Sequence, residues 1–281
     1  MAYKDILVVT DATSAGNARV ATAAALAARF GAHLTGLFVI TPPIIPTYAA
    51  AEIPQAVFEI QREAAEADAA TARKAFDAAV KATGVPAEWR IAESTVIEAT
   101  TVSARYADLV VVGQGDPETG FAAGVDPQLA GDLAIHAGRP VLVTPYAPAQ
   151  KTVGKRVLVA WNASRESARA VADAMPFLTG ASHVVTLSVN PESGQRPGTH
   201  GADPGADIAL HLARHGVKVQ AAHTVAPDID PADALLNRAS DDAIDLIVMG
   251  AYGHTRLREM VLGGVTRDML ATSPVALLLS H

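Results

Sequence analysis

Cysteine is absent from this 281-residue chain. Disulfide bonds, thiol catalysis and zinc or iron–sulfur sites built on cysteine are therefore excluded. Aromatic residues are also few, at 5% of the chain. Half of the residues are nevertheless apolar, which is enough to bury substantial hydrophobic cores.

Positive charge is in short supply as well. Lysine and arginine together number 22, against 29 for aspartate and glutamate, so the formal net charge is −7 with neutral histidine. A mildly acidic balance argues against a general binder of nucleic acid or of anionic membranes. We therefore expect neither nucleic acid nor a membrane among the partners.

No long apolar run continues without interruption. The most membrane-like stretch, residues 34–57, is broken by Pro42, Pro43, Pro46 and Pro54, and we interpret it as a loop. The first residues lead directly into an apolar strand pattern, without a charged and then apolar leader. The expected location is therefore the cytoplasm.

Apolar runs alternate with helical patterns along the first half of the chain. The patterns predict strands at 6–10, 33–40, 89–93, 107–113 and 139–144, and helices at 14–30, 55–83, 95–106 and 128–137. This alternation is typical of an α/β fold, an open parallel sheet with helices on both faces.

The pattern restarts after the proline-marked linker 145–150. Residues 154–162 match residues 3–11, residues 245–250 match 108–113, and residues 273–277 match 139–143. Three matches in the same order indicate an internal duplication. We predict two tandem domains, 1–146 and 152–281, each an open five-stranded parallel sheet.

In the second copy, helices are predicted at 164–178, 206–215 and 231–240, and strands at 182–189 and 217–225. The helical period of the first of these helices predicts a buried face of Ala168, Val171, Ala172, Met175 and Leu178.

A glycine-rich stretch follows the apolar run 244–249 and precedes a helical pattern at 265–271. Its glycines are Gly250, Gly253, Gly263 and Gly264. Glycines between a strand and a helix let backbone N–H groups approach an anion, and the helix N-terminus adds partial positive charge. The stretch therefore predicts a phosphate site. The alternative is a glycine turn needed only for tight packing of the strand against the helix.

The spacing Gly-x2-Gly-x9-Gly resembles the nucleotide-binding signature of the universal stress protein family, and the resemblance covers nearly the whole chain as two tandem copies. It implies a Rossmann-like, adenine nucleotide alpha hydrolase-like fold that binds ATP or another adenine nucleotide, alone or with Mg²⁺. The site residues that we predict from it and from the glycine loop are Asn162, Val189, Gly250, Gly253, His254, Gly263, Gly264, Val265 and Thr266.

Two of these positions depart from the family pattern. Gly264 stands where the family usually has serine or threonine, although Thr266 could supply a hydroxyl group, and Asn162 stands where the family usually has aspartate. In the first copy Asp11 keeps that aspartate, and we favour a helix cap as its role. Trp161 is interpreted as core or interface packing.

The first copy has a degenerate glycine motif. Residues 113–124 occupy the matching place, but Asp116 stands where the second glycine is expected. A carboxylate beside phosphates is repulsive, so we predict that the first copy is a partner domain and not a nucleotide site.

No catalytic constellation is recognisable. The chain has no Gly-x-Ser-x-Gly elbow, no Gly-x4-Gly-Lys-Ser/Thr loop and no paired-carboxylate motif, so ATPase activity is expected to be weak at most. An adenylating ligase would need an acceptor-substrate domain that the sequence does not indicate. His211 and His215 have a spacing that suits zinc, but we favour a solvated helix face and assign no metal.

Two hypotheses remain. The first is a stress-response protein that binds an adenine nucleotide in its C-terminal domain. The second is a nucleotide-independent scaffold, in which the two copies mimic the family homodimer and engage a protein partner. Whether the tandem chain pairs again as a homodimer stays open.

Overall fold

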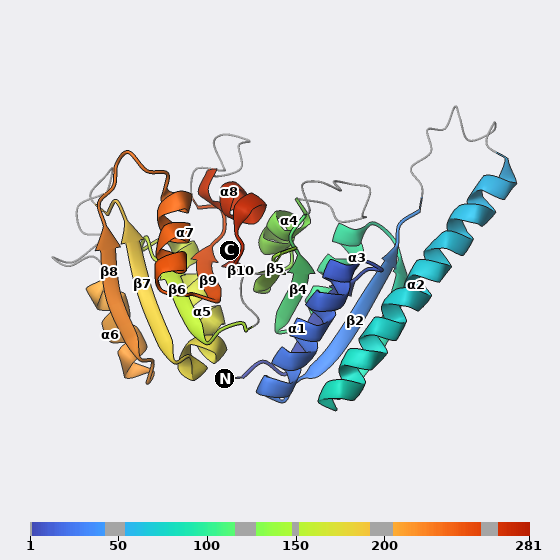
Figure 1. Ribbon diagram of the computed structural model, residues 1–281, viewed down its shortest axis with the longest axis horizontal. Coiled ribbons are helices and arrows are strands. Elements are labelled where there is room, and N and C mark those ends of the chain that lie inside the picture. The colour runs from blue at the N-terminus through green and yellow to red at the C-terminus, as the bar shows by residue number, and fades with distance from the viewer. Residues whose placement is uncertain (1, 43–53, 116–127, 148–151, 192–204, 254–263) are drawn as a thin grey trace. The chain divides into compact units, whose positions relative to one another are not determined.

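The computed structural model describes residues 2–42, 54–115, 128–147, 152–191, 205–253 and 264–281. Its contacts divide the chain into two compact units, residues 3–112 and residues 113–281. Within each unit, strands pair side by side, mostly in parallel, and helices pack on them (Figure 1).

The unit of residues 3–112 contains four parallel strands in the order β3-β2-β1-β4. The strands are β1 (Asp5–Thr10), β2 (His33–Ile40), β3 (Ala87–Glu93) and β4 (Leu109–Gly113), and the helices are α1 (Ser14–Phe30), α2 (Gln55–Thr83) and α3 (Val96–Ala104). In the described part of the chain, no helix is both long and apolar enough to cross a membrane.

Local signals set the ends of these helices. The Thr13 hydroxyl accepts a hydrogen bond from the Gly16 N–H at the start of α1. Gly31 and Gly84 end α1 and α2 in the left-handed conformation, with φ of 62° and 71°. Because glycine adopts this conformation without a steric penalty, both helices end where the sequence predicts.

The unit of residues 113–281 contains six strands in the order β5-β10-β9-β6-β7-β8. They are β5 (Val141–Thr144), β6 (Arg156–Ala160), β7 (His183–Val189), β8 (Val219–Thr224), β9 (Leu246–Gly250) and β10 (Ala276–Ser280). The helices are α4 (Leu129–His136), α5 (Arg165–Gly180), α6 (Ala206–Arg214), α7 (Pro231–Asp241) and α8 (Gly264–Thr272). The predicted α/β fold is confirmed.

Strand β5 is the one antiparallel neighbour among the paired strands of this unit. It belongs to the first sequence copy and is the counterpart of β10, with Leu142 opposite Leu278. Equivalent edges of the two copies thereby cover each other. The compact units divide at residue 112, whereas the sequence repeat restarts after residue 150, so α4 and β5 lie in the same unit as the second copy.

The predicted buried face of α5 is partly wrong. Val171 and Leu178 are buried as expected, but Ala168 and Ala172 are exposed. The helix instead buries Glu166, Ser167, Ala170, Ala174 and Phe177. The contacts of α5 with β9 and β10 set which face is buried. Alanine occurs on both faces of the helix, so the spacing of apolar residues does not distinguish the buried face from the exposed one.

A carboxylate just before the fourth strand of each copy holds the start of the first strand. Asp245, which is 3% exposed, accepts hydrogen bonds from the backbone N–H groups of Gly154, Lys155 and Arg156 and from the Thr152 hydroxyl. Its counterpart Asp108 accepts only from the N–H groups of residues 4 and 5. In both copies, an aspartate just before the fourth strand thus hydrogen-bonds to the backbone at the start of the first strand.

We expect Asp245→Asn to lower the free energy of unfolding by about 2–3 kcal/mol, because buried N–H groups lose charge-assisted partners. Asp108→Asn is the matched control, and its smaller set of bonds should cost less. Urea denaturation of both variants measures the difference. Equal losses would show that Asp245 has no special role.

Candidate functional site

A cavity of about 580 Å³ opens at the carboxyl ends of β6, β7 and β9, within the unit of residues 113–281. This is the edge of a parallel sheet at which ligands of open α/β folds bind. Seven of the nine predicted site residues line the cavity: Asn162, Val189, Gly250, Gly253, Gly264, Val265 and Thr266. The other two, His254 and Gly263, lie outside the described residues.

The sequence reasoning missed several further lining residues: Ser164, Glu166, Leu187, Pro231, Leu235 and Tyr252. Leu187 could have been found, because a strand places residues i and i+2 on one face and Val189 was already in the set. Trp161, predicted as packing, is half-buried and lines the cavity as well.

The three described glycines of the motif differ in what surrounds them. A Cβ built on Gly250 would lie 2.6 Å from the Glu166 carbonyl carbon and from the Ser167 nitrogen, so a side chain is excluded by the first turn of α5. Among the described residues, a Cβ on Gly253 would meet nothing closer than 3.9 Å and a Cβ on Gly264 nothing closer than 3.8 Å. Packing against the described residues therefore accounts for glycine at 250 but not at 253 or 264.

The backbone around the cavity adopts unusual conformations. Four described non-glycine residues have positive φ, and three of them, Ala163, Asn190 and Tyr252, adjoin or form the cavity lining. Such conformations cost free energy and cluster at binding sites. The rim is thus held in place at some energetic cost.

Some polar groups at the cavity form hydrogen bonds with other residues of the protein. The Asn162 Oδ1 accepts from the Ser164 N–H at 3.1 Å, and Ser164 in turn caps α5. Thr266 is buried, and its hydroxyl oxygen lies 3.4 Å from the Tyr252 nitrogen, linking both ends of the glycine stretch. The Asn162 amide and the Thr266 hydroxyl proton remain donors by chemistry.

Glu166 is the one carboxylate among the described residues that line the cavity. Its side chain is 2% exposed, and its Oε1 contacts Arg165 at 3.0 Å. Its Oε2 is buried without a hydrogen-bond partner in the described structure. Burial raises the pKa of this carboxyl, but the backbone N–H of Glu166, the Arg165 side chain and the Ser164 hydroxyl outweigh it, so the pKa lies below its ordinary value.

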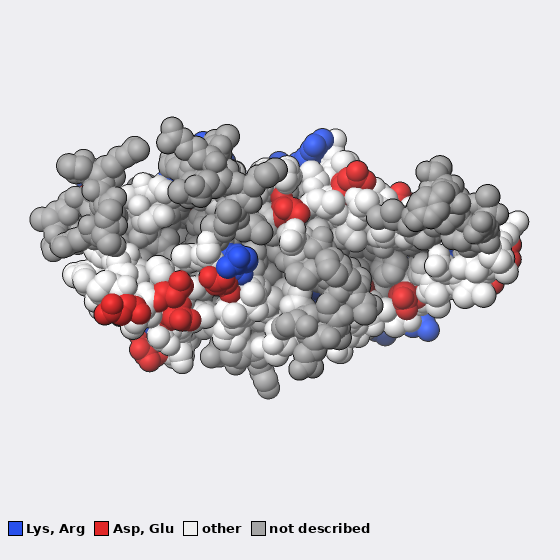
Figure 2. Space-filling model, turned by 90° about the horizontal axis from the view of Figure 1, so that it is seen from above, with Lys and Arg blue, Asp and Glu red and all other residues white. Residues whose placement is uncertain are grey.

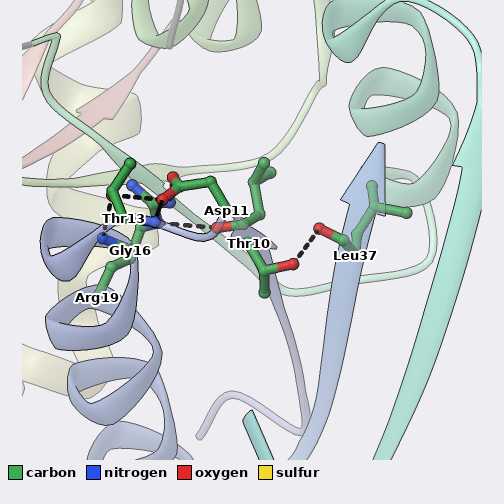
Figure 3. A network of polar contacts seen from close by, with 7 residues as sticks. Thr10, Asp11, Thr13, Gly16, Arg19 and Leu37 are labelled. Atoms are coloured by element: carbon green, nitrogen blue, oxygen red, sulfur yellow. Dashed lines mark hydrogen bonds and ion pairs between the residues drawn. The ribbon is translucent and has the colours of Figure 1, made fainter. Parts of the chain in front are cut away.

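Asp11 of the first copy is the counterpart of Asn162, and its carboxylate is bonded to other side chains of the protein. Asp11 accepts from the Thr13 N–H at 2.9 Å and from the Thr13 hydroxyl, and it forms an ion pair with Arg19 (Figure 3). Arg19 is 4% exposed and also donates to the Val9 carbonyl. The cap itself is Thr13, so the predicted capping role of Asp11 is corrected to one of supporting Thr13 and Arg19.

Gln114 follows β4, at the start of the degenerate glycine motif of the first copy. Gln114 is 6% exposed, donates to the Leu270 carbonyl at 3.0 Å and accepts from the Tyr146 N–H at 3.3 Å. Asp116 lies outside the described residues.

The described residues contain no group of metal ligands, and the face drawn in Figure 2 shows no cluster of described basic side chains. The rings of His211 and His215 lie 4.8 Å apart between centroids, but the described residues contain no group of three His, Asp or Glu that could hold an ion. On the face in Figure 2, the described basic side chains lie singly, several of them beside acidic ones.

We expect Gly250→Ala to lower the free energy of unfolding by about 1–3 kcal/mol, since the backbone of α5 must move away from the added methyl group. Gly253→Ala and Gly264→Ala are the controls and should change stability by less than about 1 kcal/mol. Thermal or urea unfolding compares the three. A Gly250→Ala variant as stable as the controls would contradict the close contact.

We also expect Arg19→Met to lower the free energy of unfolding at neutral pH by about 3 kcal/mol, because it leaves Asp11 without its buried partner. Burial raises the pKa of the Asp11 carboxyl, but Arg19 and Thr13 outweigh it, so the folded pKa lies below the ordinary value of an aspartate. The stabilisation is therefore present above that value and is lost as the pH falls through the folded pKa.

The loss caused by Arg19→Met should accordingly shrink toward acid pH in denaturant titrations. Arg62→Met, which breaks an exposed pair in α2, is the control and should cost under about 1 kcal/mol at any pH. A loss that does not depend on pH would contradict the ion pair.

Comparison with known proteins gives a consistent picture of the fold. The chain is 27% identical over 178 residues to universal stress protein Slr1230 of Synechocystis sp., a match covering 61% of this chain and 57% of that relative. It is 37% identical over 43 residues to universal stress protein MJ0577 of Methanocaldococcus jannaschii, covering 15% and 26%. The chain thus matches about half or less of the length of these relatives.

Among solved structures, a universal stress protein from Archaeoglobus fulgidus is similar with a TM-score of 0.73, at 17% identity, over 98% of this chain and 95% of that one. At this identity the likeness shows the fold alone. The model of the universal stress protein family matches residues 2–145 and again residues 154–281. The chain therefore belongs to the universal stress protein family, with two domains of that family in tandem.

Proposed function

We propose that this protein binds ATP or another adenine nucleotide in its C-terminal domain, residues 152–281. The observation that supports this most is the space beside Gly253 and Gly264, which packing against the described residues does not require and which lies at the carboxyl ends of parallel strands. Bare backbone N–H groups at that edge suit phosphoryl oxygens.

The cavity has walls that suit a nucleoside. Leu187, Val189, Pro231 and Leu235 supply apolar surface for a purine, and Asn162 supplies polar atoms at the end of β6. Val265 and Thr266 lie in the first turn of α8, where partial positive charge favours the phosphates. His254 and Gly263 complete the proposed set from outside the described residues.

The domain of residues 1–146 acts, in this proposal, as a partner domain without nucleotide. Asp11 is held by Arg19 and Thr13, which leaves its carboxylate committed inside the protein. Nucleotide occupancy in the second domain would bias conformation or partner binding during a stress response in the cytoplasm. A weak ATPase activity would be incidental to that role.

The second candidate is a nucleotide-independent scaffold. The antiparallel pairing of the equivalent strands β5 and β10 favours it, because equivalent surfaces meet as they do at an isologous dimer contact. The glycine at 264, in place of a hydroxyl residue, also favours it. Mass spectrometry of gently purified protein separates the two, since a co-purified adenine nucleotide argues against the scaffold.

Calorimetric titration with ATP and Mg²⁺ tests the proposal. Gly253→Asp should abolish binding, because a carboxylate then occupies the phosphate position. Gly264→Ser should tighten binding about fivefold, because the added hydroxyl supplies roughly one hydrogen bond. Ala206→Asp is the control, an exposed residue at the start of α6 away from the cavity, and should bind like the parent.

Absence of binding at millimolar ATP, with the parent and Gly253→Asp giving the same result, would remove the proposed function.

A further inference from the structure

The Glu166 carboxylate lies where the proposed phosphate site begins. A Cβ built on Gly253 would lie 3.9 Å from Glu166 Oε2, and this oxygen is buried without a hydrogen-bond partner in the described part of the chain. Glu166 also lines the cavity. An unpaired acceptor thus lies beside the backbone that would receive phosphoryl oxygens.

The backbone fixes the point from which the Glu166 side chain starts, and that side chain is 2% exposed. A Cβ on Gly250 would lie 2.7 Å from Glu166 Cβ, so the first turn of α5 is held tightly against the end of β9. Ser164 caps the same turn by accepting from the Ser167 N–H at 3.1 Å. The carboxylate therefore has little freedom to leave the glycine turn.

Arg165 does not neutralise the charge on the cavity side. It contacts Oε1, the oxygen other than the unpaired one, and its own side chain is 71% exposed. Ion pairs with an exposed partner are weakened by solvent and salt. Since the pKa of Glu166 is lowered, the group is negatively charged at neutral pH.

A metal-free phosphate at Gly253 would consequently face a fixed negative charge in a partly enclosed site, where charges interact more strongly than in water. The repulsion grows with each phosphate charge that is not neutralised. A hard divalent cation reverses the effect, because Mg²⁺ is commonly bound by one or two carboxylates together with substrate phosphates. The unpaired oxygen of Glu166 fits that role.

We propose that Glu166 is a specificity-determining residue that excludes metal-free polyphosphates, so that a nucleoside diphosphate or triphosphate enters this cavity only with a divalent cation. The inference rests on the proposed nucleotide site. It adds that the site accepts polyphosphates only when a cation neutralises part of their charge.

The test is calorimetric titration of the full chain with AMP, ADP and ATP, each in EDTA and in Mg²⁺. In EDTA the affinity of the parent should fall from AMP to ATP, and Mg²⁺ should raise the affinity for ATP at least about tenfold. Glu166→Gln should bind metal-free ATP at least about tenfold more tightly than the parent, with a smaller change for AMP. Its response to Mg²⁺ should largely disappear.

Glu98→Gln is the matched control. Glu98 also lies in the first turn of a helix and accepts from Ser94, but it is exposed and lies outside the cavity. This variant should reproduce the affinities of the parent in every titration. Glu166→Asp keeps the charge and should keep the preference for Mg²⁺.

Three results distinguish the two proposals. If the parent binds no nucleotide under either condition, the proposed function fails and the inference falls with it. If the parent binds ATP equally in EDTA and in Mg²⁺, nucleotide binding stands and the inference is wrong. If Glu166→Gln keeps the parent's order of affinities and its response to Mg²⁺, the selection does not come from Glu166. Should that variant fold poorly, the parent series and Glu166→Asp still decide.

Discussion

The close contact between α5 and the end of β9 is the constraint on which the cavity depends. No side chain fits at position 250, because the backbone of residues 166 and 167 already occupies the space of a Cβ. This contact places the start of α5 beside the glycine turn and buries Glu166 there. A larger separation would put the carboxylate in solvent and open the cavity wall, so packing at one glycine sets the electrostatics of the site.

The two copies share this architecture and differ in what fills the corresponding place. Both tie the first strand to the fourth through an aspartate, Asp108 or Asp245. After its first strand, however, the first copy places an ion pair between Asp11 and Arg19, whereas the second copy has Asn162 at the rim of a cavity. The two copies therefore differ in a few side chains beyond the strand ends, while the order of the paired strands is the same.

Most of the fold could be predicted from the sequence, because apolar runs and a helix-ending glycine such as Gly31 act locally, although the capping residue of α1 is Thr13 and not the predicted Asp11. The lining positions at the ends of β6, β7 and β9 could also be predicted, since parallel strands end at one edge. Glu166 could not, because its burial arises from a contact between segments far apart in sequence. The antiparallel pairing of β5 with β10 escaped prediction for the same reason, as hydrophobic period does not specify which edges meet.

The backbone conformations around the cavity bear on the choice between a scaffold and a ligand site. A packing role explains Gly250, but the described residues give no steric reason for glycine at 253 or 264. It also leaves unexplained why alanine and tyrosine, at 163 and 252, adopt positive φ at the rim, where glycine would cost less. Positive φ at these rim residues therefore favours the proposed ligand site over a role in packing alone.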